Sequence, residues 1–166
     1  VLEALSIADI KQILRAPYLE TVELCVDLAK QRFNPLMPDI ELVLALMECP
    51  IAQARELAYQ WVNQNPSFYQ LKPEFIITAF QSQHIENLSF IDNFLNRYPL
   101  SISDAKRVIE GVLTPFLEGY TSFDENNATH TSEDERLKTV INVFLNIFSK
   151  ELSVINLAIP NVLLNK

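Results

Sequence analysis

The sequence predicts an all-α protein, an α-solenoid of about four stacked helix pairs with an inserted loop in the fourth pair. Three observations support this fold class. The 166 residues include only two Gly but nine Pro, which leaves too little glycine for tight hairpins or for phosphate-binding loops. Apolar residues recur at the spacing of amphipathic helices. The whole pattern also repeats at a step of 33 residues.

The repeat is clearest in the longer helix of each pair. Cys25, Ala58 and Ile91 are 33 positions apart, and each belongs to a stripe of four apolar residues on one helix face. The recurrence of one stripe at one offset indicates structural units rather than chance. The three stripes are Leu24, Cys25, Leu28 and Ala29, then Leu57, Ala58, Trp61 and Val62, then Phe90, Ile91, Phe94 and Leu95.

A shorter helix precedes each longer one and carries a stripe of its own. Its apolar positions step through four units at the same interval, so each unit is a helix pair. These positions are Ile10, Ile13 and Leu14, then Val43, Leu46 and Met47, then Ile76, Ala79 and Phe80, then Ile109, Val112 and Leu113.

Start and stop signals agree with this pairing. Proline follows each longer helix, in Asn34-Pro35, Asn65-Pro66 and Tyr98-Pro99, where it cannot continue a helical ladder. Polar caps and a first-turn proline suit the shorter helices. The candidates are Ser6, Asp39, Pro73 and Ser101 or Ser103. We expect helices at about 6–15, 18–33, 39–48, 51–64, 73–82, 84–97, 103–119, 132–149 and 151–158.

The units span about 6–35, 36–66, 67–99 and 100–149 of a single domain, followed by an apolar tail at 150–166. The fourth unit departs from the period, because residues 121–131 are polar and acidic and the stripe resumes 50 positions after Phe90, as Val140. We expect an inserted loop there, and a kink at Pro115. The apolar tail lacks the polar face of a terminal repeat, so we expect a fragment of a longer protein.

The chain resembles the HEAT and armadillo class of α-solenoids. The resemblance lies in the strings Pro50-Ile51-Ala52-Gln53-Ala54 and Ala54-Arg55-Glu56-Leu57-Ala58, and covers roughly residues 6–149. The step of 33 is shorter than is usual for that class, and tetratricopeptide and ankyrin signatures are absent. The resemblance implies a binding scaffold whose second helices present a concave surface to a protein partner.

The sequence offers no catalytic, cofactor-binding or metal-binding set. Cys25 and Cys49 lie in apolar runs and are expected to be buried free thiols in a reducing cytoplasm. His84 and His130 are 46 positions apart, and His84 is expected to begin a helix and to bond a neighbouring backbone group. His130 lies among acidic residues at 124–135, which we interpret as a capped helix start rather than a calcium loop.

The charge distribution and the aromatic pattern limit the classes of partner that we expect. The formal net charge of -8 is spread along the chain, so a phosphate-binding stripe for nucleic acid is not expected. The longest unbroken apolar run has six residues, 42–47, so no membrane partner is expected and the chain should be soluble. Trp61 shares the register of Leu28 and Phe94 and is expected in the core rather than in a base-stacking platform.

Polar residues of the longer, second helices form a candidate contact surface, which we call the second-helix strip. Asn63 and Asn96 are 33 positions apart, and Asn146 follows 50 further on, as the insertion requires. Armadillo-class proteins hold an extended peptide with such an asparagine ladder, although Asn is also common at helix ends. The partner-binding candidates are Glu23, Asp27, Glu56, Gln60, Asn63, Asn93, Asn96 and Asn146. Lys30 and Ser89 complete the strip.

The expected function is that of a non-enzymatic scaffold or adaptor segment that binds a protein or an extended peptide, basic near the first two units. Two other interpretations remain open. The chain is a regulatory or recruiting domain of a larger enzyme, or, from the resemblance alone, a HEAT-like nucleic-acid repair enzyme, which the acidic charge disfavours. No cofactor is expected.

Overall fold

A computed structural model of the chain describes residues 5–16, 18–121, 141–142 and 145. The chain divides into two compact units, residues 1–98 and 99–166, and each is described by itself. Every regular element in the described ranges is a helix, which confirms the all-α prediction.

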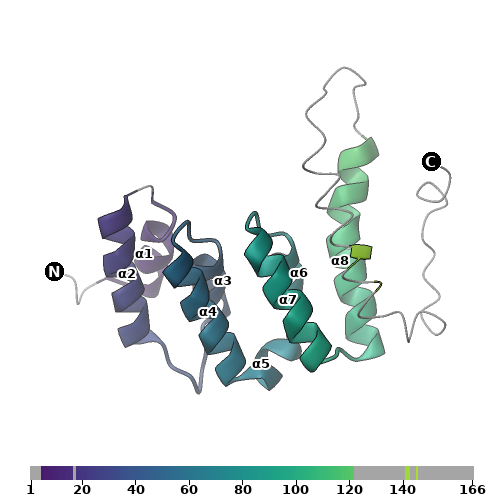
Figure 1. Cartoon of the computed structure of the whole chain (residues 1–166), viewed down its shortest axis with the longest axis horizontal. Coiled ribbons are helices and arrows are strands. Elements are labelled where there is room, and N and C mark those ends of the chain that lie inside the picture. The colour runs from purple at the N-terminus through teal and green to yellow at the C-terminus, as the bar shows by residue number, and fades with distance from the viewer. Residues whose placement is uncertain (1–4, 17, 122–140, 143–144, 146–166) are drawn as a thin grey trace. The chain divides into compact units, whose positions relative to one another are not determined.

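The first unit contains three helix pairs and one short helix (Figure 1). Each shorter helix packs against the longer helix that follows it, and α3 also contacts α1 and α6. The pairs are α1 (Ile7–Ile13) with α2 (Leu19–Arg32), α3 (Ile40–Met47) with α4 (Ala52–Gln64), and α6 (Pro73–Phe80) with α7 (Ile85–Arg97).

The predicted caps are present on the shorter helices. Ser6 caps α1, and Asp9 completes a capping box by accepting from the Ser6 backbone N–H at 2.8 Å. These bonds from Ser6 lower the pKa of Asp9. Asp39 caps α3 by accepting from the Leu42 N–H at 2.9 Å, and Pro73 stands in the first turn of α6.

A fifth helix, α5 (Pro66–Gln70), lies where the sequence predicted only a connection. Pro66 was expected to mark the end of the preceding helix, and α4 does end at Gln64. The same proline opens α5, because a fixed φ and a missing N–H suit the first position of a helix as well as they suit a helix end. Tyr69 on α5 is completely buried.

The apolar stripes form most of the core, although Leu24 is exposed and Ile13, Phe90 and Leu113 are only half-buried. Cys25, Ala58 and Ile91 are all buried, as their shared register predicted. Leu24, expected in the same stripe, is 41% exposed, whereas its counterpart Phe90 is half-buried and stacks on Tyr59 of the preceding pair. No described helix precedes the first pair, so Leu24 has no such neighbour.

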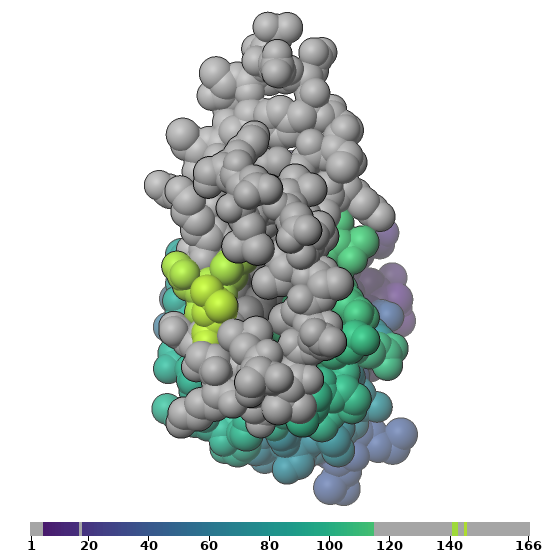
Figure 2. Space-filling model, turned by 90° about the vertical axis from the view of Figure 1, so that its right-hand side faces the viewer, coloured from purple at the N-terminus to yellow at the C-terminus, as the bar shows by residue number. Residues whose placement is uncertain are grey.

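The second unit contains α8 (Ile102–Thr121). Ser101 caps it by accepting from the Asp104 N–H at 3.2 Å, as predicted. One face of α8 is buried through Ala105, Val108 and Val112. Residues 141, 142 and 145 are also helical and form the yellow-green patch in Figure 2. Thr121, the first residue of the expected loop at 121–131, still belongs to α8. The rest of that loop, most of the helix at 132–149 and the tail lie outside the described residues.

Candidate partner-binding surfaces

The second-helix strip is solvent-exposed wherever the structure describes it. All three of its asparagines on α4 and α7 are exposed, and so are its charged residues on α2 and α4. Asn146 lies outside the described residues. The exposed members are Glu23, Asp27 and Lys30 on α2, Glu56, Gln60 and Asn63 on α4, and Ser89, Asn93 and Asn96 on α7.

Several polar groups of the strip already bond within their own helix. The amide of Asn93 donates to the Ser89 carbonyl at 2.8 Å, and the amide of Asn96 donates to the Asp92 carbonyl at 2.9 Å. Lys30 pairs with Asp27 at 3.0 Å. One N–H of Asn93 and the amide nitrogen of Asn96 are therefore engaged, while both side-chain carbonyl oxygens remain able to accept from a partner.

Trp61 belongs to the core, as its register predicted. Its side chain is 6% exposed and stacks on Phe33, with ring centroids 3.7 Å apart and an interplanar angle of 6°. A buried, stacked indole has no free face for a nucleic-acid base.

A buried polar cluster joins the second pair to the third. Asn87 on α7 is fully buried, and its amide donates to the Met47 carbonyl at the end of α3 at 2.8 Å and also to the Ser82 hydroxyl. The Tyr59 hydroxyl on α4 donates to the Asn87 side-chain carbonyl at 2.5 Å. Both ends of the Asn87 amide are thus satisfied by groups of other elements, which fixes its orientation.

Arg55 on α4 is 8% exposed and holds the turn between α3 and α4. One guanidinium nitrogen donates to the Cys49 carbonyl at 2.8 Å and to the Pro50 carbonyl at 3.1 Å, and the other lies 3.8 Å from Glu86. Arg55 was not among the candidate site residues predicted from the sequence. The sequence did contain the signal, because Arg55 is a charge at a register otherwise occupied by Val22 and Leu88.

His84 lies just before α7, at its N-cap, and its ring nitrogen Nε2 is 3.3 Å from the Glu48 carbonyl. His84 thus lies one residue before the helix that it was expected to begin, and the backbone group that its ring contacts is distant in sequence rather than neighbouring. The contact crosses from the third pair to the second, like that of Asn87. His130 lies outside the described residues.

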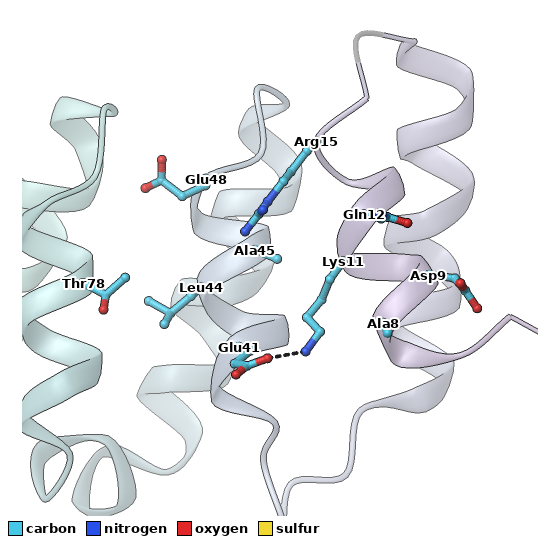
Figure 3. A pocket seen from close by; sticks show the side chains of 10 residues that line it. All are labelled: Ala8, Asp9, Lys11, Gln12, Arg15, Glu41, Leu44, Ala45, Glu48 and Thr78. Atoms are coloured by element: carbon cyan, nitrogen blue, oxygen red, sulfur yellow. Dashed lines mark hydrogen bonds and ion pairs between the residues drawn. The ribbon is translucent and has the colours of Figure 1, made fainter.

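A groove lies on the face of the shorter, first helices (Figure 3). Its volume is about 480 Å³, within the range of ligand-binding clefts. We call it the first-helix groove. It is lined by Ala8, Asp9, Lys11, Gln12 and Arg15 of the first pair, Glu41, Leu44, Ala45 and Glu48 of the second, and Thr78 of the third.

The lining residues of the first-helix groove occupy matching positions of successive first helices. Gln12, Ala45 and Thr78 are 33 positions apart, and so are Arg15 and Glu48. The sequence analysis used only the apolar positions of these helices and so missed the groove. A comparison of their polar positions at the same step would have grouped these residues.

The described residues contain two buried cysteines and no cluster of metal-ligating side chains. Within these ranges no group of three or more His, Cys, Asp or Glu is placed to hold a metal ion. Cys25 and Cys49 are buried and unpaired, and burial raises the pKa of both thiols. None of the helices described combines the length and apolar character that a membrane span requires.

No family model, no curated protein and no solved structure matches the chain. The case for a function therefore rests on the helix arrangement and on the two surfaces described above.

Proposed function

We propose that residues 5–98 are three units of an α-solenoid of the HEAT-like kind and that the chain is a non-enzymatic scaffold which binds another protein. The partner is an extended segment, basic near the first two units, which lies on the second-helix strip. The observation that carries the proposal is the equal spacing of the helix starts.

The first helices begin at Ile7, Ile40 and Pro73, each 33 positions after the one before. The second helices begin at Leu19, Ala52 and Ile85, with the same spacing. In an all-α protein without repeats, helix starts need not be equally spaced along the sequence. Repeated units that stack on one another have equally spaced helix starts, because each unit packs on a neighbour of the same structure. The shared interval therefore supports a repeat architecture.

Contacts between pairs support the same proposal. The first helices contact one another in sequence, α1 with α3 and α3 with α6, so each pair packs on the next. Lys11 of the first pair forms an ion pair with Glu41 of the second, and Asn87 of the third pair bonds the Met47 carbonyl of the second. Nearest-neighbour contacts of this kind are how repeat proteins gain stability.

The chemistry of the strip favours a basic, extended partner. Glu23 and Glu56 are exposed carboxylates of the first two second helices, and no described residue forms an ion pair with either. Asn63 and Asn96 add exposed amides at one register, able to bond a partner's main chain. Each such bond adds about 0.5–1.5 kcal/mol, so affinity requires several contacts together with electrostatic attraction.

The test is a selection of linear peptides from a random display library on the whole chain, followed by affinity measurements on variants. The double variant Asn63→Ala, Asn96→Ala should bind the selected peptides about tenfold more weakly, because two amide contacts are lost. Its melting temperature should stay nearly unchanged, since both side chains are exposed.

A matched control removes two exposed amides outside the strip, Gln81 and Gln83, by substitution with Ala. It should bind like the unchanged chain. A fall in melting temperature without a fall in affinity for the Asn63, Asn96 variant would show that these residues serve only their own helices. This alternative has to be excluded because Asn96 already bonds the Asp92 carbonyl of its own helix.

A further inference from the structure

The first-helix groove keeps two charges unpaired after its internal pairs are made. Lys11 is engaged with Glu41, and Asp9 is engaged with Ser6 in the capping box. The side chains of Arg15 and Glu48 form no ion pair or hydrogen bond with any other described residue. The groove therefore presents one guanidinium and one carboxylate to a ligand.

These two charges lie on either side of α3. In Figure 3, Arg15 extends from the end of α1 toward α3, whereas Glu48 projects from the end of α3 on the side of Thr78. They are at matching positions of adjacent first helices, and packed helices are about 8–10 Å apart. A ligand that meets both charges must carry an anion and a cation several ångströms apart.

The remaining lining suits a peptide main chain. Leu44 is half-buried and Ala45 is buried, so the floor over α3 is apolar and low. The side chains of Gln12 and Thr78 are exposed on opposite sides of this floor, and they offer amide and hydroxyl groups to backbone N–H and C=O.

We propose that the first-helix groove binds an extended peptide segment that lies across α3 and carries an acidic and a basic side chain two residues apart. In an extended chain such side chains share one face and are about 6.6 Å apart, a separation that the long side chains of Arg15 and Glu48 can bridge. The carboxylate meets the Arg15 fork, and the cation meets Glu48.

This site is distinct from the second-helix strip. The groove is lined only by residues of the first helices and of the turns that end them, whereas the strip lies on α2, α4 and α7. The proposal therefore stands or falls independently of the proposed function of the strip.

The experiment titrates the isotope-labelled whole chain with three capped pentapeptides at low salt, and follows amide resonances of Ala45 and Thr78. The probes are Ala-Glu-Ala-Lys-Ala, Ala-Glu-Ala-Glu-Ala and Ala-Lys-Ala-Lys-Ala. We expect the mixed-charge peptide to shift these resonances and to bind at least about threefold more tightly than either like-charged peptide, as expected for exposed charge pairs.

Charge reversal should switch the preference. Arg15→Glu leaves two unpaired acids in the groove, at positions 15 and 48, and should favour the Lys-Lys peptide. Glu48→Arg leaves two unpaired cations and should favour the Glu-Glu peptide, each by at least about threefold. Lys30→Glu, a matched reversal on the strip, should keep the preference for the mixed peptide. Circular dichroism should show unchanged helicity, because Arg15 and Lys30 are exposed and Glu48 is only half-buried.

Equal binding of the three peptides to the unchanged chain would overturn the proposal, as would an absence of shifts at Ala45 and Thr78. The proposal would also be overturned if Lys30→Glu changed the peptide preference as Arg15→Glu does, because the preference would then depend on the net charge of the chain alone. The Asn63, Asn96 variant should retain the mixed-peptide preference, which separates this result from the test of the strip.

Discussion

The Tyr59 hydroxyl donates a hydrogen bond of 2.5 Å to the side-chain carbonyl of Asn87, and this bond links α4 to α7. Asn87 is fully buried, and its amide nitrogen donates hydrogen bonds to the Met47 carbonyl and the Ser82 hydroxyl. Its carbonyl oxygen has Tyr59 as its partner among the described residues. Removal of that one hydroxyl therefore leaves a buried acceptor without a bond.

Tyr59→Phe should lower the free energy of unfolding by about 1–3 kcal/mol, because the Asn87 oxygen stays desolvated without a donor. The ring stack on Phe90, with centroids 4.3 Å apart, is kept by the substitution. Urea unfolding measures the change. Tyr18→Phe removes the hydroxyl of a side chain that is 68% exposed and should stay within about 0.5 kcal/mol of the unchanged chain. Equal effects of the two substitutions would contradict this account.

Tyr69→Phe should affect the free energy of unfolding in the opposite direction to Tyr59→Phe. The Tyr69 hydroxyl is buried and has no hydrogen-bond partner among the described residues, so its removal relieves a desolvation cost and breaks no bond. We expect the free energy of unfolding to rise by up to about 1 kcal/mol, or to stay constant. A loss of more than about 1 kcal/mol in urea unfolding would instead reveal a bound water or another partner at the hydroxyl.

Stability should fall in alkaline solution through the same two phenols. Burial raises the pKa of Tyr59 to about 12 and that of Tyr69 to about 12, from the usual 10.0 of a tyrosine, and Asp39 adds to the effect on Tyr69. The folded chain therefore keeps protons that the unfolded chain releases between about pH 10 and 12. The stabilisation is complete below pH 10 and is lost as the pH rises toward 12.

Urea unfolding at several pH values from 9 to 12 should show this slope, and Tyr59→Phe with Tyr69→Phe should reduce it. Part of the slope should remain, because burial also raises the pKa of Cys25 and Cys49. If the double variant kept the full slope, neither phenol would be the source.

Arg55→Met should destabilise the turn between α3 and α4 by about 1–3 kcal/mol, because the Cys49 and Pro50 carbonyls lose their donor. Arg55→Lys should recover only part of the loss, since an ammonium lacks the planar fork of a guanidinium. Arg97→Met, an exposed change at the end of α7, is the matched control. Thermal unfolding of the three variants gives the ranking, and a fully restored melting temperature with Lys would exclude a role for the fork.

The sequence predicted the long helices well because their apolar stripes are long and regular. Predicted starts are one residue early at α1, α2, α3, α4 and α7, because each predicted range includes the N-cap residue. The short helix α5 was missed for a physical reason. Asn65-Pro66 is a stop signal for the preceding helix and also a start signal for a following one. The five residues of α5 are too few to show the apolar periodicity of a helix.

The candidate surfaces were predictable in part. Exposure of the second-helix strip followed from its position opposite the apolar stripe. On α4, for example, Glu56 and Asn63 are exposed, whereas their sequence neighbours Leu57 and Val62 are buried. The register of Arg55 signals an unusual buried charge, but the acceptors of the Arg55 and Asn87 bonds were not predictable, because they are backbone carbonyls at the end of α3 and in the turn after it. Sequence patterns report side chains and carry no signal for such acceptors.

The same backbone acceptors bear on how this chain can evolve. Asn87 and His84 contact main-chain oxygens of Met47 and Glu48, and every residue type supplies such an oxygen. Substitution at Glu48 can therefore change the charge of the first-helix groove while the junction between neighbouring pairs keeps its acceptor. If the groove binds a peptide as proposed, its specificity can change during evolution through residue 48, whereas the junction depends on the side chains of His84 and Asn87.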